Sequence, residues 1–386
     1  MEVLILVGAF QSVFFAVLVL SKKQKSISDK ILALWLSLFA VHLAFVYYSF
    51  QSGHVFYIEY GHFPSGAIVV YYTLMYVYTE SLISKENVFK AKWIFHFIPT
   101  AVIYISIVPL AQLPYKEKAN LITHITTDPY LNFVFGIIIL FTTIYLVATL
   151  KLLKKHKVFI RKMFSYEENI SLNWLRILTF LLVLLWIVIS SLAAYIYYLD
   201  PTLIMLPEDH MVIDMKGQSA FVAFVFLLGF FGIRQQVIYS IPLQEKGITT
   251  IESETKSASN RYEKSGLKKE DSASHLKRLF QYMEEEKPYL KGKLSLKEVA
   301  ENMNISTNHL SQIINENLEK NFFDFVNAYR VDLVKQKMRD PSNKKYTILS
   351  LAYDCGFNSK SSFNAVFKKL EGLTPTEFLN KKRPNN

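Results

Sequence analysis

The sequence predicts an all-α chain: an N-terminal bundle of seven transmembrane helices, then a C-terminal cytoplasmic all-α domain in which a long helix joins two helix-turn-helix units. Three observations support this fold class. The long apolar runs are confined to residues 1–239, whereas residues 240–386 have the composition of a soluble protein. Seven of those runs are long enough to cross a bilayer. Two stretches of the C-terminal part repeat each other with an offset of 52 or 53 residues.

Each predicted span approaches the roughly 20 mostly apolar residues that a helix needs to cross a hydrocarbon core of about 30 Å. The seven spans are Val3–Leu20, Ile31–Phe50, Phe63–Ile83, Trp93–Leu113, Tyr130–Leu150, Leu175–Leu199 and Ser219–Tyr239. The seventh has the shortest clean run, because Arg234 follows Ile233, but an arginine near a helix end can reach the membrane surface. Glu2 precedes the first run and lysines follow it, which is the reverse of a signal peptide, so we expect this span to be retained.

The basic residues between the spans predict the orientation of the bundle, because cytoplasmic loops carry an excess of lysine and arginine. The first, third and fifth connections are the most basic, and the fifth alone holds Lys151, Lys154, Lys155, Lys157, Arg161 and Lys162. The second connection has no basic residue, and the sixth has Lys216 beside four acidic residues. The sequence therefore predicts an outside N-terminus and a cytoplasmic C-terminal domain.

Composition sets the expected domain limits at 1–239 for the membrane domain, 240–274 for a flexible linker and 275–386 for the C-terminal domain. The linker is rich in Ser, Thr, Lys and Glu and poor in apolar residues, so it cannot bury much surface. Residues 272–386 carry 19 basic and 13 acidic residues, a net charge of +6 that suits a polyanionic partner. Cys355 is the only cysteine, which excludes an internal disulfide.

The two repeated stretches are Leu294–Leu318 and Tyr346–Leu370, and each predicts a short helix, a tight turn and a second amphipathic helix. Ser295 and Glu298 have the spacing of a capping box that begins the first helix. Gly356 supplies a turn residue that tolerates a positive φ. Ile305 and Phe357, just past the turns, are suited to holding each pair of helices together.

The second helix of each unit, here called the recognition helix, has one apolar and one polar face. In the first unit Leu310, Ile313, Ile314 and Asn317 share one face, three of the four being apolar. In the second, periodicity predicts a buried face made of Phe363, Val366, Phe367 and Leu370. Amide side chains suit hydrogen bonds to adenine edges, and lysines suit phosphates or guanine. The residues expected to contact DNA are Asn308, His309, Ser311, Gln312, Asn315, Lys360, Ser361, Ser362, Asn364, Lys368 and Lys369.

These motifs resemble the AraC family of bacterial regulators. The resemblance covers roughly residues 275–383 and rests on LSLKEVA and NHLSQ in the first unit and on CGFNSKSSFNAVFKK and GLTPTEF in the second. It implies that two units, joined by one long helix, enter successive major grooves about 34 Å apart. Phe322–Lys337 would be that joining helix, with Phe325, Val326, Tyr329 and Leu333 facing inward.

Two departures from the family pattern bear on the site. Glu319 and Lys320 stand where the family often has a turn glycine, and Ala365 stands where many relatives carry a long polar side chain. Alanine can touch a thymine methyl group but cannot donate to a base. We therefore expect the first unit to supply more of the base reading and the second more of the phosphate contacts.

Other residues that can carry chemistry favour no second site. His54, His62, His124 and His210 fall in connections predicted outside, but their spacing matches no metal motif. His42 is the ionisable residue nearest the centre of a predicted span. No protease, phosphate-loop or hydrolase motif is present, so we expect neither catalytic residues nor a cofactor.

The sequence thus predicts a regulator anchored in the bacterial inner membrane that senses an unknown ligand or membrane state and binds double-stranded promoter DNA. Its expected partners are the lipid bilayer, RNA polymerase and a second copy of the chain in a homodimer. Two other readings stay open: a transporter-like membrane protein whose tail regulates its own gene, and a tether between chromosome and membrane. A transporter would favour polar residues in several spans and internal repeats, and a tether would bind DNA with little sequence preference.

Overall fold

The structure is a computed structural model, and it describes residues 2–60, 62–84, 86–123, 128–168, 170–198, 207–235 and 269–381. The chain forms two compact units, one of Met1–Lys154 with Leu172–Leu243 and one of Lys155–Ser171 with Gln244–Asn386. Within the described ranges the elements are helices, with one isolated antiparallel β-bridge between Phe164 and Ser295. The predicted all-α class is confirmed.

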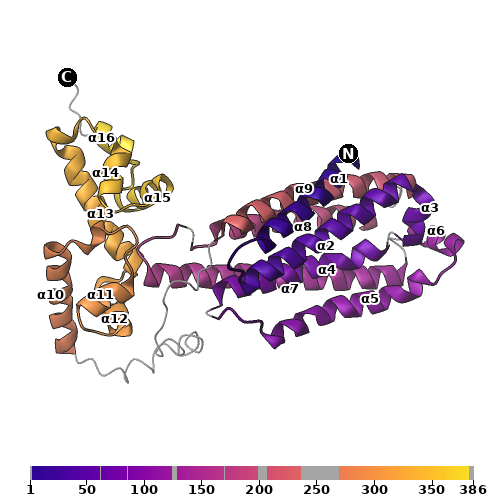
Figure 1. Cartoon of the computed structure of the whole chain (residues 1–386), viewed down its shortest axis with the longest axis horizontal. Helices are drawn as coiled ribbons and strands as arrows, with labels where there is room; N and C mark the ends of the chain where they lie inside the picture. Colours follow the sequence, from indigo (N-terminus) through magenta and orange to yellow (C-terminus); the bar gives the residue numbers. More distant parts are fainter. Residues whose placement is uncertain are drawn as a thin grey trace. The chain divides into compact units, whose positions relative to one another are not determined.

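Helices of the first unit overlap all seven predicted spans and run alongside one another (Figure 1). Helix α7 continues 13 residues past the predicted end at Leu150, and α9 begins 12 residues before Ser219. Residues 199 and 236–239 of the predicted spans lie outside the described residues. They are α1 (Glu2–Leu20), α2 (Ile27–Gln51), α4 (His62–Ile83), α5 (Ile98–Ala111) with the preceding 3-10 helix η1 (Ala91–Phe97), α7 (Pro129–Met163), α8 (Asn173–Tyr198) and α9 (Pro207–Arg234). The short helices α3 (His54–Tyr60) and α6 (Tyr115–Thr123) lie in the second and fourth connections. The division between the units falls inside α7, since the residues from Lys155 onward belong to the second unit.

Four segments among the described residues are long and apolar enough to cross a membrane: α1, α2, Ala91–Ala111 and α7. Shorter apolar helical segments occupy Ala67–Ile83, Asn173–Val188 and Phe221–Arg234. The apolar helical bundle is therefore confirmed, and the number of seven crossings stays a prediction.

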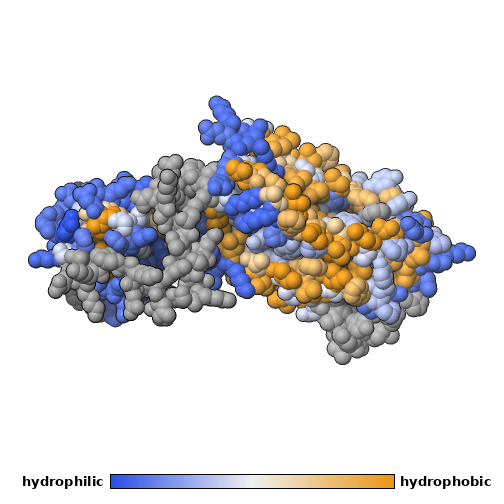
Figure 2. Space-filling model, turned by 90° about the horizontal axis from the view of Figure 1, so that it is seen from below, coloured by the Kyte–Doolittle hydropathy of each residue, from blue (hydrophilic) through white to orange (hydrophobic). Residues whose placement is uncertain are grey.

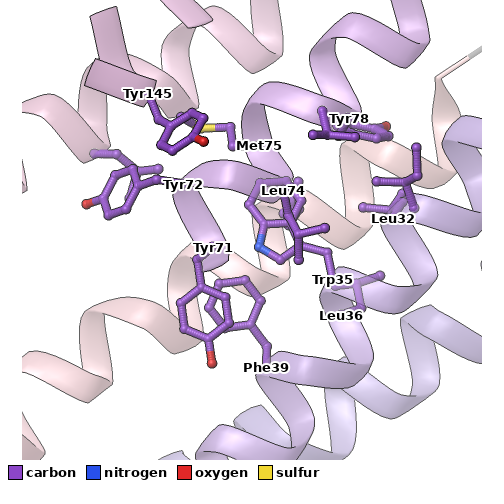
Figure 3. Packing of buried hydrophobic residues seen from close by; sticks show 14 of the residues in the cluster. Leu32, Trp35, Leu36, Phe39, Tyr71, Tyr72, Leu74, Met75, Tyr78 and Tyr145 are labelled. Carbon is purple, nitrogen blue, oxygen red and sulfur yellow. The ribbon is translucent and has the colours of Figure 1, made fainter. Parts of the chain in front are cut away.

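A cluster of aromatic side chains lies within the core of the first unit (Figure 3). Trp35 and Phe39 of α2 meet Tyr71 and Tyr78 of α4, and the Phe39 and Tyr71 rings stack with centroids 4.2 Å apart. Tyr145 of α7 lies in the same cluster. Stacked and tilted aromatic pairs add specific geometry to apolar burial, so this cluster fixes how α2, α4 and α7 pack.

The outer surface of the same unit is also apolar. Phe10, Ile105 and Phe133 are each exposed by 65% or more, although such side chains usually lie inside soluble proteins. Figure 2 shows the apolar colouring concentrated on this unit and the hydrophilic colouring on the C-terminal one. An apolar surface around an apolar core is consistent with a membrane region.

His42, singled out from the sequence, is buried on α2, and its Nε2 atom lies 3.0 Å from Oε1 of Gln218 on α9. A buried polar group needs such a partner, so this contact satisfies the imidazole inside the bundle. The side chains of His54, His62, His124 and His210 lie outside the described residues. In the part of the chain that is described, no group of three or more His, Cys, Asp or Glu residues could hold a metal ion.

The second unit contains the C-terminal helices α10 (Lys269–Glu285), α11 (Leu296–Asn302), α12 (Thr307–Leu318), α13 (Phe322–Arg339), α14 (Ile348–Asp354), α15 (Lys360–Glu371) and α16 (Pro375–Lys381), with 3-10 helices η6 (Pro288–Leu290) and η7 (Pro341–Asn343). Residues 240–268 of the predicted linker lie outside the described residues. Helix α10 begins at Lys269, so the last six residues assigned to the linker are helical.

Helix α13 is the predicted joining helix, and it ends two residues later than predicted. Figure 1 shows α11 and α12 near one end of α13 and α14, α15 and α16 near the other. Phe325 and Val326 are buried in the core around α11 and α12, where Tyr329 and Leu333 are partly buried. Val331 and Val334 are buried in the core around α14 and α15. The predicted inward face is therefore only part of the buried surface of this helix, because Val331 and Val334 were not predicted. One helix supports both helix pairs.

Candidate nucleic-acid interface

The first unit is built from α11, a tight turn and α12. Ser295 caps α11, its hydroxyl accepting from the Glu298 N–H at 3.2 Å. The other half of the predicted capping box is wrong, because the Glu298 carboxylate accepts from Lys291 Nζ at 2.5 Å instead. An ammonium group offers that carboxylate a charged donor, which the backbone N–H of Ser295 cannot match. In the turn, the Ile305 N–H donates to the Ala300 carbonyl at 3.0 Å.

The second unit repeats this design with α14 and α15. The Phe357 N–H donates to the Ala352 carbonyl at 3.1 Å, as Ile305 does to Ala300 in the first unit. Gly356 has φ +92°, and a Cβ atom there would lie 2.4 Å from the Tyr289 carbonyl oxygen, so the predicted need for glycine is confirmed. Asn304 takes the matching position with φ 55°, a conformation that asparagine tolerates better than most residues.

The change of offset from 52 to 53 residues lies in the turn. Met303 and Cys355 end the first helices, 52 residues apart, whereas the N-caps Ser306 and Ser359 of the recognition helices are 53 apart. The additional residue of the second turn is Asn358, whose Nδ2 donates to the Gly292 carbonyl at 2.7 Å. The longer turn is therefore anchored to the loop before α11.

The buried faces of both recognition helices agree with the predicted periodicity except in the last turn. Leu310, Ile313, Ile314, Phe363, Val366 and Phe367 are buried. Asn317 and Leu370, which occupy equivalent positions 53 residues apart, are exposed. The prediction that Leu370 is buried is wrong, because the last helical turn has passed the edge of the core.

The opposite face of α12 carries the amide side chains expected to read bases. Asn308 and Asn315 are exposed, and His309, Ser311 and Gln312 are partly exposed. Gln312 Nε2 donates to Glu316 Oε1 at 3.0 Å, and Asn315 Nδ2 donates to the Ser311 carbonyl at 2.8 Å. These hydrogen bonds along the helix surface orient both amide groups. For the amide nitrogens to donate to a base, the hydrogen bonds to Glu316 and Ser311 must break.

The matching face of α15 is basic. Lys360, Ser361, Asn364, Lys368 and Lys369 are exposed and Ser362 is partly exposed. Lys369 Nζ lies 2.8 Å from both carboxylate oxygens of Asp324 on α13. The equivalent of Lys369 on α12 is Glu316, so the two faces differ in charge. Both acidic partners were missed from the sequence, although an acid four residues after Gln312 is a recognisable pairing signal.

A family model described as a helix-turn-helix domain matches residues 299–381. The C-terminal part of the chain carries an AraC-type helix-turn-helix domain. A relative, the uncharacterized HTH-type transcriptional regulator YtdP of Bacillus subtilis (strain 168), is 28% identical over 90 residues, which are 23% of this chain and 11% of the relative. The chain therefore covers about a tenth of that protein. No solved structure gives a significant match.

Within the AraC-type domain, the matched residues begin at Val299 in α11 and end in α16, so they include both recognition helices and the joining helix. The sequence-predicted site residues therefore all lie inside the matched range. They fall on two polar faces, amide-rich on α12 and basic on α15, and both helices pack against cores to which α13 contributes.

Proposed function

We propose that this chain is a membrane-anchored, sequence-specific transcription regulator of the bacterial inner membrane. Its AraC-type domain binds promoter DNA on the cytoplasmic side, and its helical bundle senses a ligand or a membrane state. The HTH-type regulator name of the relative and the helix-turn-helix family match support the DNA-binding part. The apolar helices support the anchor.

One observation carries the proposal: a single helix supports two recognition helices, one with an amide-rich polar face and the other with a basic one. Because α13 contributes buried residues to both cores, the two faces move as parts of one body. The amides of α12 suit adenine edges, and the lysines of α15 suit the phosphate backbone. The domain would thus read sequence mainly with Gln312 and Asn315 and hold the duplex mainly with Lys360 and Lys368.

The orientation of the bundle follows from the basic connections, which predict a cytoplasmic C-terminus. A cytoplasmic C-terminus brings the domain to chromosomal DNA. Contact with RNA polymerase and pairing of two chains on DNA complete the proposal, since a second module tethered nearby raises the effective concentration for a second site. Reporter fusions after Lys23 and after Gly53 should give cytoplasmic and outside signals respectively; identical signals would contradict the orientation.

Footprinting with the full chain in lipid nanodiscs tests the function. Fragments of the chromosome region around its own gene should show a discrete protected site with two contacts about one helical turn apart. Protection without sequence preference, which falls steeply with salt, would support a chromosome tether instead. A reporter gene driven by the protected promoter should change its expression when the chain is deleted, and an unchanged reporter would exclude regulation at that site.

A further inference from the structure

Arg330 of α13 is almost completely buried, with 1% exposure, and it makes hydrogen bonds to two segments distant in the sequence. Its guanidinium donates to the Tyr289 and Lys291 carbonyls, both at 2.8 Å, in the loop before α11. It also donates to the backbone carbonyl and the hydroxyl of Ser165, both at 3.0 Å. Ser165 follows α7 and precedes α8, about 130 residues before the loop that shares this guanidinium.

The Ser165 segment is held by backbone pairing as well. The Ser165 N–H donates to the Leu294 carbonyl at 3.0 Å, next to the β-bridge between Phe164 and Ser295. Asn327 Nδ2 donates to the Ser165 carbonyl at 3.0 Å. Phe164 is 3% and Ser165 1% exposed. Buried backbone groups with specific partners are typical of a built contact rather than of a loop passing over a surface.

The residues on either side of this pair contact α13 and the second helix-turn-helix unit. The Arg161 guanidinium lies over the Phe323 ring, 5.2 Å from its centroid, and forms an ion pair with Glu167. Glu168 Oε1 accepts from the Ser359 hydroxyl at 2.8 Å. Ser359 is the N-cap of α15, whereas Ser295 is the N-cap of α11. One short segment therefore touches the start of a helix in each unit.

Arg330 meets neutral acceptors, and the nearby Glu168 carboxylate favours its charged form. Burial lowers the pKa of Arg330 to about 10, while Glu168 acts in the opposite direction. The guanidinium is therefore charged at neutral pH and depends on its acceptors. Leaving donors of a buried charge unsatisfied costs more than the loss of ordinary hydrogen bonds, so two of its acceptors, both in Ser165, favour keeping the segment in place.

We propose that Arg161–Glu168, within the connection between the fifth and sixth predicted spans, is a docking segment of the DNA-binding domain that contacts both helix-turn-helix units and α13. This segment is a second attachment of the DNA-binding domain, besides the chain before α10. A rearrangement of α7 or α8 would act directly on the N-caps of α11 and α15. The read-out through DNA rests on the proposed function, whereas the attachment itself does not.

Cysteine cross-linking of the full chain in its membranes tests the attachment. In a Cys355→Ala background, Glu168→Cys with Ser359→Cys should be joined by a short bismaleimide within one chain. Glu168→Cys with Ser306→Cys is the matched control, because Ser306 is the equivalent N-cap of the first unit and its hydroxyl bonds to its own helix at His309. We expect at least about fivefold more intramolecular product for the first pair. Equal yields, or product only between two chains, would overturn the proposal.

A second variant separates docking from simple proximity. Ser165→Pro removes the N–H that meets Leu294, and it should lower the cross-linking yield at least about threefold; an unchanged yield would contradict the built contact. The footprint of each sample distinguishes the two proposals. Cross-linking without any footprint would support the attachment and contradict the DNA-binding function. A normal footprint without cross-linking would support the DNA-binding function and contradict the attachment. A footprint whose affinity changes several-fold after cross-linking supports control of DNA binding by this segment, and an unchanged affinity overturns that control.

Discussion

Glu319 and Gly372 end the two recognition helices in the same left-handed conformation, with φ 50° and 73°. Each backbone N–H donates to the carbonyl four residues earlier, Glu319 to Asn315 at 3.1 Å and Gly372 to Lys368 at 3.0 Å. The missing glycine of the first unit therefore leaves its geometry intact. The cost is conformational, because a residue with a Cβ atom adopts this conformation less readily than glycine.

Substitutions at this pair should have opposite effects. Glu319→Gly should raise the free energy of unfolding by about 0.5–1 kcal/mol, and Gly372→Ala should lower it by about 1–2 kcal/mol. The urea midpoint for alkylation of Cys355 in the full chain reports both, since this thiol is buried in the core around α14 and α15. A lower urea midpoint for Glu319→Gly than for the unaltered chain would show that the left-handed conformation of Glu319 is not strained.

The same thiol predicts a pH dependence. Burial raises the pKa of Cys355 from 9.0 to about 11. Folding therefore disfavours the thiolate, so this residue's contribution to stability is complete below pH 9 and is lost as the pH rises through about 11. Cys355→Ala should flatten the stability profile between these pH values. If the free energy of unfolding of Cys355→Ala falls with pH as steeply as that of the unaltered chain, other groups cause the loss of stability.

Gln312 and Lys368 should differ in how they affect DNA binding. Gln312→Ala should weaken binding to the specific site by about 1–3 kcal/mol, through the loss of discrimination at one base pair, and should change binding to random DNA little. Lys368→Ala should weaken all DNA and reduce the salt slope by about one. Titrations on matched and mutated sites at several salt concentrations separate these effects; equal losses on random DNA would contradict the roles.

Asp324 should limit the phosphate contacts of α15, because it holds Lys369 by two hydrogen bonds. Asp324→Asn removes the carboxylate and should raise affinity for random DNA several-fold, with a steeper salt dependence. Asp332→Asn is the matched control, since Asp332 lies on the same helix and pairs with Lys335 instead. Equal gains for both variants would indicate a general charge effect.

Arg330 should be needed as an arginine. In Arg330→Lys the lysine side chain keeps the charge, but its single ammonium group cannot reach all of the carbonyl oxygens that the guanidinium meets. We therefore expect the free energy of unfolding to fall by about 2–4 kcal/mol. Arg339→Lys on the exposed end of α13 is the control and should change stability by less than about 0.5 kcal/mol. Both are measured by the urea midpoint of Cys355 alkylation, and equal midpoints would contradict the importance of the buried hydrogen bonds.

Local patterns in the sequence predicted most of the fold. The apolar runs coincide with helices because apolar composition over some 20 residues is a strong local signal. The turns were predicted for the same reason, since Gly356 and the cap Ser295 act within a few residues. Leu370 was misassigned because periodicity continues to a helix end while the core does not.

Contacts between distant segments could not be predicted from the same patterns. The bonds of Ser165 with Arg330 join residues 165 positions apart, which no helical period reports. One signal was nevertheless available, because Arg330 lies four residues from both Val326 and Val334 on the apolar stripe of the joining helix. A charged residue on such a stripe indicates a buried partner that remains to be found.

The place of Ser165 also bears on how the DNA-binding domain can be prepared. Its compact unit is assembled from two stretches of chain, Lys155–Ser171 and the part after residue 243. A fragment that starts at α10 would lack the acceptors that Ser165 gives to Arg330 and the strand partner of Ser295. A synthetic peptide covering residues 155–171 should complement such a fragment, in the way that two pieces of a cleaved protein reassemble.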